Sequence, residues 1–104
     1  MKILHESYAS QGQNTVLDRV VIVDGRVYRV LVRADSSYPQ QSQLRVEVWT
    51  PAGWAEVLHP LGMCYTSQMA AMSSYDRDQA KVRRLTTEFS DELLLQARRI
   101  VGAA

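Results

Sequence analysis

Apolar and polar residues alternate through the first half of the chain, which predicts antiparallel strands. Two valine-rich runs, 20–23 and 26–32, flank the dipeptide Asp24-Gly25. Asp-Gly tolerates the two positive φ angles of a type I′ turn, so we expect the two runs to pair as a β-hairpin. The polar stretch 34–43 has no apolar period and predicts a surface loop after this hairpin.

A second pair of strands is expected further along. Residues 44–50 alternate, with Leu44, Val46 and Val48 on one side and Arg45, Glu47 and Trp49 on the other, as in a half-exposed strand. The turn 51–53 carries proline early and glycine late, so 54–58 is expected to return beside that strand. A strand near 2–8 would complete a β-meander of four or five strands.

The pattern changes after residue 62, where Met, Ala and Gln replace Val and predict helix. A short helix is expected over 66–71 and a long one of about 26 residues from Ser73 or Ser74, where serine and nearby aspartates resemble an N-cap. Its apolar stripe comprises Tyr75, Val82, Leu85, Phe89, Leu93 and Ile100. A break at Ser90 is the alternative, but the stripe continues across it. The sequence therefore predicts an α+β fold, with both helices packed on the sheet.

Composition narrows the class of protein without naming a function. The chain has 104 residues, 46% of them hydrophobic and 22% charged, which is typical of one soluble globular domain. Its formal net charge of +1 gives no general attraction to nucleic acid or anionic membranes. Its single cysteine, Cys64, the absence of a signal-peptide pattern and the lack of a long apolar run lead us to expect a cytoplasmic protein without a membrane span.

Both faces of the predicted hairpin are rich in apolar residues. One face carries Leu17, Val21, Val23, Tyr28, Val30 and Val32. The other carries Val16, Val20, Ile22, Val27 and Leu31, interrupted by Asp18, Arg29 and Arg33. One long helix covers one face of such a sheet, so the second face has two explanations. The first is that the second face is internal, because the sheet curls into a half-barrel or because the 69–72 segment covers that face. The second is that this face is an interface with another molecule.

Four further residues bear on an interface. Trp49 and Trp54 flank the 50–53 turn, where their indoles should pack across the hairpin, and tryptophan often dominates binding energy. Leu94 and Leu95 lie about 120° and about 220° from Val82 on a helical wheel, away from the stripe, which predicts that they point outward. With Tyr28 as a further aromatic candidate, these residues favour a non-enzymatic module that binds another protein or itself, a homodimer being the first geometry to test.

Binding to nucleic acid is the alternative. Its candidate residues are Lys81, Arg83 and Arg84 on the helix, with Arg29 and Arg33 on the sheet beside aromatic residues on which bases could stack. On the wheel the three helical cations spread around the helix and form no stripe. An ordinary solvated helix face is therefore the competing explanation for them.

An enzyme that uses Cys64 and His59 is a second alternative, because a thiolate beside an imidazole is an activated nucleophile. Burial of the thiol in the core is its competing explanation. The common cofactor and hydrolase motifs are absent, so we expect no catalytic residue, metal or cofactor.

One resemblance rests on composition alone. With ten arginines, two lysines and many valines in a small chain, the sequence resembles accessory proteins of actinobacterial phages. This similarity implies binding to, or inhibition of, a host protein, and it assigns a role to no residue.

Overall fold

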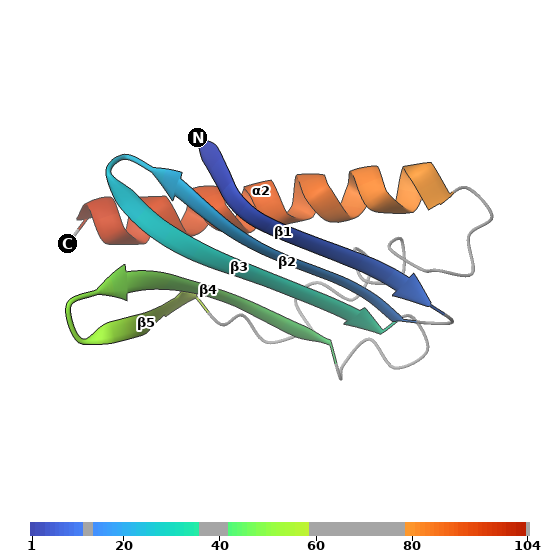
Figure 1. Ribbon diagram of the computed structural model, residues 1–104, viewed down its shortest axis with the longest axis horizontal. Coiled ribbons are helices and arrows are strands. Elements are labelled where there is room, and N and C mark those ends of the chain that lie inside the picture. Colours follow the sequence, from blue (N-terminus) through green and yellow to red (C-terminus); the bar gives the residue numbers. More distant parts are fainter. Residues whose placement is uncertain (12–13, 36–41, 59–78, 104) are drawn as a thin grey trace.

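A computed structural model describes residues 1–11, 14–35, 42–58 and 79–103. Five antiparallel strands form one sheet in chain order: β1 (Lys2–Gln11), β2 (Asn14–Val23), β3 (Arg26–Asp35), β4 (Gln43–Thr50) and β5 (Gly53–Leu58). The helix α2 (Gln79–Ala103) packs along one face of this sheet (Figure 1). The predicted α+β meander is confirmed with five strands. The short helix expected over 66–71 lies outside the described residues, as do most of the 34–43 loop and the start of the long helix.

The two short turns follow from their residues. Asp24 and Gly25 have φ angles of 55° and 72°, as a type I′ turn requires, and Val23 pairs with Arg26 across them. In the second hairpin the Thr50 hydroxyl accepts a hydrogen bond from the Ala52 amide at 3.2 Å and donates one to the Gly53 carbonyl at 2.7 Å. Gly53 has a φ of 112°, a conformation that side chains disfavour.

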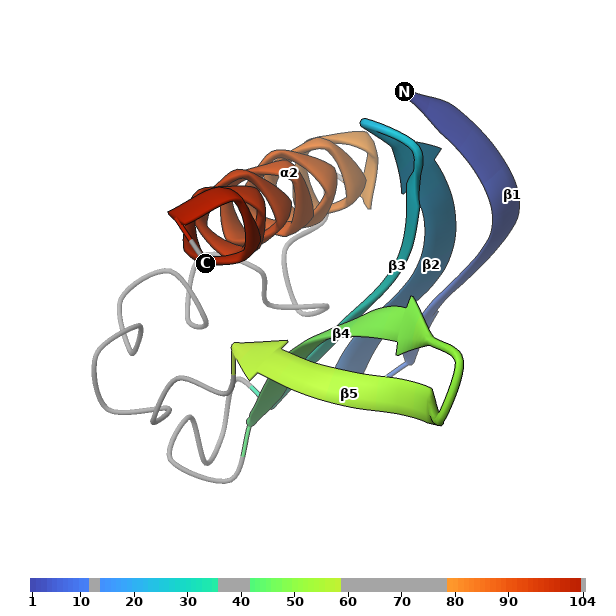
Figure 2. The same cartoon turned by 90° about the vertical axis from the view of Figure 1, so that its left-hand side faces the viewer.

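The sheet curls around the helix, so that α2 lies on its concave side (Figure 2). We call this concave side the inner face and the convex side the outer face. The inner face forms the core with α2, and its fully buried strand residues are Thr15, Leu17, Val21, Tyr28, Val30, Val32, Ala34, Leu44 and Val46. The face of the hairpin that carries Leu17 is therefore the one that the helix covers.

The helix runs unbroken for 25 residues through Ser90, so the alternative break is wrong. Its buried side differs from the predicted stripe by about 50° of rotation. Small or hydroxylated side chains face the sheet at Thr86, Ser90 and Ala97, and they let the helix approach closely. This rotation buries Leu94 in the core and leaves Ile100 exposed, contrary to both predictions.

Candidate interaction surface

The register of the strands arranges the outer face in rows that cross the sheet. The row nearest the two hairpin turns contains Ile22, Val27, Trp49 and Trp54. Ile22 pairs with Val27 and Trp49 with Trp54, and the β3–β4 pairing ends at Tyr28 and Val48, one residue before Val27 and Trp49. We call these four residues the apolar row. The row therefore consists of two cross-strand apolar pairs at the same end of the sheet, one aliphatic and one aromatic.

The tryptophan pair is the most exposed part of the apolar row. The two indole centroids lie 5.3 Å apart with an interplanar angle of 72°, an edge-to-face contact. Trp49 remains 55% exposed and Trp54 39% exposed despite this contact. The predicted cross-strand pairing of the indoles is therefore confirmed, and each ring still presents much of its surface to solvent.

Charged residues of both signs fill the next rows of the outer face. Arg29 donates two hydrogen bonds to the Asp18 carboxylate, from Nε to Oδ1 at 3.2 Å and from Nη2 to Oδ2 at 2.8 Å. This bonding to Asp18, together with the charges of Asp18 and of Glu47 on β4, raises the pKa of Arg29 above its ordinary value. Arg29 therefore keeps its charge at every pH at which the protein would be handled.

Further aliphatic residues extend the apolar character of the outer face among these charges. Val16 and Val20 on β2 and Leu31 on β3 are all half-buried. Within the described ranges, α2 is the sole helix, and it lies against the opposite face (Figure 2). The outer face is thus the sheet surface that the described part of the chain leaves without a packing layer.

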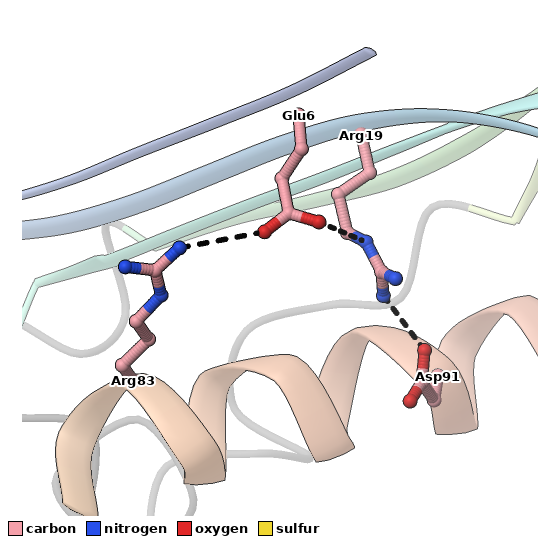
Figure 3. A network of polar contacts seen from close by, with 4 residues as sticks. All are labelled: Glu6, Arg19, Arg83 and Asp91. Carbon is pink, nitrogen blue, oxygen red and sulfur yellow. Dashed lines mark hydrogen bonds and ion pairs between the residues drawn. The ribbon is translucent and has the colours of Figure 1, made fainter. Parts of the chain in front are cut away.

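A separate polar network joins β1, β2 and α2 on the inner face (Figure 3). The Arg19 side chain is 4% exposed, and its Nη1 donates to Asp91 Oδ1 at 2.7 Å while its Nε lies 3.4 Å from Glu6 Oε2. Arg83 Nη2 lies 3.7 Å from Glu6 Oε1, and the Arg83 guanidinium stands 5.0 Å from the centroid of the Tyr8 ring. This network ties the edge strand β1 to the helix.

The sequence analysis did not single out this network, although a signal for it was present. Arg19 lies two residues from Leu17 and two from Val21, so strand alternation places it on their face. A buried arginine needs a carboxylate, and Asp91 and Glu6 supply one each. A second tie between helix and sheet, from Arg98 Nε to Asp24 Oδ2 at 2.9 Å, was likewise not predicted.

The predicted interface residues do not lie on one surface. Trp49 and Trp54 are on the outer face, whereas Tyr28 is 1% exposed and Leu94 4% exposed inside the core, so neither is available to a partner. Tyr28 belongs to the inner face because the helix covers the Leu17 side of the hairpin. Leu95 is exposed as predicted, but it lies on the helix, on the other side of the sheet from the tryptophans.

The predicted nucleic-acid residues are also divided between two sides of the sheet. Arg29 and Arg33 lie on the outer face, whereas Lys81, Arg83 and Arg84 belong to the helix on the inner side. Most are already paired: Arg29 with Asp18, Arg83 with Glu6, and Arg84 with Glu88 at 4.0 Å, while Lys81 also has an interaction partner. They form no continuous basic strip on which a strand of nucleic acid could lie.

The residues of the predicted alternative enzyme, His59 and Cys64, lie outside the described residues. In the described ranges no group of three or more His, Cys, Asp or Glu side chains could hold a metal ion. Nor does any helix in those ranges combine the length and apolar character that crossing a membrane requires.

Comparison with known proteins gives no relative from which a role could be transferred. The chain matches no protein-family model, no curated protein and no solved structure.

Proposed function

We propose that this protein is a self-associating interaction module and that the outer face of its sheet binds the same face of a second copy. The observation that carries the proposal is the apolar row, which ends in two tryptophans that stay 55% and 39% exposed. Tryptophan is enriched among the residues that dominate binding energy, because it buries a large area with few rotatable bonds.

The charges of the outer face favour a second copy over nucleic acid as the occupant. By the strand register, its basic residues are Lys2, Arg29, Arg33 and Arg45, and its acidic residues are Asp18, Asp35, Glu47 and Glu56. A surface with both signs in nearly equal number gives little attraction to a polyanion. Across a two-fold axis, the same surface can place each charge of one copy near an opposite charge of the other.

The shape of the outer face sets the size of the contact. The sheet curls around α2, so the outer face is convex, and two copies meet over only part of it (Figure 2). We place that part at the apolar row. With Trp49 55% and Trp54 39% exposed, and about 250 Å² for one tryptophan side chain, the pair offers about 235 Å² per copy. The tryptophan pair is thus the centre of the proposed contact, and flanking outer-face residues have to bring the total buried area above about 1,000 Å² for a specific, reversible dimer.

Sedimentation velocity of the full chain over about 1 μM to 1 mM tests the proposal, since this range brackets a micromolar dissociation constant. We expect self-association with a micromolar dissociation constant, which weakens about tenfold or more in the variant W49S/W54S. The matched control is Leu95→Ser, which removes an exposed apolar side chain from the far side of the helix and should leave the equilibrium unchanged.

Two results would overturn the proposal. One is a monomer at every concentration. The other is self-association whose dissociation constant changes less than about threefold in W49S/W54S, while the variant keeps the far-ultraviolet circular dichroism of the natural chain. Titration with a single-stranded oligonucleotide at low salt tests nucleic acid as the alternative occupant of the outer face. Binding that depends on the tryptophans and weakens as salt is added would assign the face to nucleic acid.

A further inference from the structure

The meander leaves two strands at the edges of the sheet, β1 and β5, and they differ in how they are protected. An edge strand carries backbone N–H and C=O groups that can pair with another strand, and proteins usually block it with short length, bulges, lysine or proline. β5 has six residues and a register shift that leaves Val57 unmatched between Leu58 and Glu56. Its edge is therefore short and irregular.

β1 has fewer of these devices: its unbroken segment carries Glu6, an inward-pointing charge of the kind that also protects edges. It has ten residues, and its one register shift, at Leu4, lies near its start. From His5 to Gln11 the pairing with β2 is unbroken, and this segment contains no lysine or proline. Seven residues at about 3.3 Å each give an edge about 23 Å long.

Side-chain contacts tie this segment to β2 and α2. Glu6 is bound by two arginines, Arg19 from β2 and Arg83 from α2, so its charge is neutralised on the inner face (Figure 3). The Tyr8 ring lies against the same Arg83, and the Ser10 and Thr15 hydroxyls are 3.2 Å apart. A strand ordered in advance loses little entropy when another strand pairs with it.

We infer that the β1 edge from His5 to Gln11 pairs antiparallel with the same edge of a second copy, with the two-fold axis at Tyr8. Tyr8 is the midpoint of the unbroken segment, so this register uses all of it. Ser7 then lies opposite Ala9 of the other copy, and Glu6 opposite Ser10, so no like charges meet. A register centred on Glu6 would set two carboxylates against each other. The two five-stranded sheets would join into one continuous sheet.

This contact uses a different surface from the outer-face contact and does not depend on it. The test therefore uses the background W49A/W54A, in which the proposed outer-face contact is removed. In that background we expect sedimentation to show a dimer that persists at submillimolar concentration. A monomer up to about 1 mM in the folded background overturns the edge pairing and leaves the outer-face proposal unaffected.

Two exposed positions of β1 test the register itself. In the variant S7K/A9K, lysines of the two copies face each other at both 7–9 contacts, and we expect the dimer to dissociate about tenfold or more readily than in S7K/A9E. These variants differ only at residue 9, and S7K/A9E places opposite charges at the same contacts. The difference between the two dissociation constants should shrink in 0.5 M salt, where the Debye length is below about 5 Å. Equal dissociation constants at low salt would refute the Tyr8-centred register.

A disulfide gives a second measurement that does not depend on charge. With Cys64 replaced by Ser, a chain carrying Ser7→Cys is mixed with one carrying Ala9→Cys under mild oxidation. We expect a mixed dimer to form at least about fivefold faster than either chain links to itself, because directly opposed strand positions suit disulfide geometry. Equal rates for mixed and self-linked products would count against this pairing.

Discussion

Replacement of Trp49 by Ala tests the outer-face contact most directly, because Trp49 is the more exposed member of the indole pair. The variant removes an indole that is 55% exposed, which is about 140 Å² if a tryptophan side chain offers about 250 Å². Its register partner Trp54 keeps its place on β5, so the remaining surface is only locally altered.

The magnitude follows from this area. If half of it is covered in the dimer, each copy buries about 70 Å² on Trp49, which contributes about 1.7 kcal/mol at about 25 cal/mol per Å². A two-fold contact contains the residue twice, so the loss is about 3.5 kcal/mol, or about 300-fold in dissociation constant. A micromolar dimer would then dissociate over most of the accessible concentration range.

Isothermal dilution calorimetry and sedimentation equilibrium both measure this constant. Leu95→Ala is the matched control, since Leu95 is also exposed but lies on the far side of the helix. Thermal unfolding monitors the fold, which should change little because loss of one partly exposed aromatic pair costs about 1 kcal/mol. A dissociation constant that changes less than about threefold in a folded Trp49→Ala variant would refute the placement of the contact.

Three further predictions concern the fold. Urea unfolding should show that Leu94→Ala lowers the free energy of unfolding by about 2–5 kcal/mol, whereas Leu95→Ala changes it by less than about 1 kcal/mol. Equal losses would contradict the orientation of α2. Asp91→Ala should cost about 1.5–3 kcal/mol, because the buried Arg19 guanidinium loses its shortest hydrogen bond, while Arg19→Met should be nearly neutral or stabilising. If Arg19→Met lowers the free energy of unfolding more than Asp91→Ala does, the ion pairs of Arg19 stabilise the fold by more than the cost of desolvating them. Gly25→Ala should destabilise by about 1 kcal/mol, because its φ of 72° is unfavourable for alanine although a Cβ there would meet no atom within 4 Å; thermal unfolding that shows no loss would mean that the turn relaxes.

Much of the fold could be predicted because local chemistry decides it. The Asp24-Gly25 turn fixes the register of β2 with β3, and that register assigns every hairpin residue to one of two faces. The same reasoning set Trp49 opposite Trp54. These features depend on turn geometry and alternation, which the sequence carries directly.

The remainder depends on tertiary packing. Both faces of the hairpin are apolar, so the sequence alone could not decide which one the helix covers, and Tyr28 was proposed for an interface although it lies in the core. Leu94 was misplaced because the helix turns its small residues toward the sheet, and a helical wheel that weights large apolar side chains misses this rotation. The register of the sheet, however, could have indicated the buried Arg19.

The order of elements along the chain has a consequence for biosynthesis. All five strands leave the ribosome before α2, so the nascent sheet lacks the helix that covers Leu17, Val30 and Val46 until α2 has been made. A polypeptide stopped before Gln79 would lack the helix that covers the apolar inner face. Exposed apolar surface of this kind is what chaperones and proteases recognise, so completion of α2 is the step that ends this exposure.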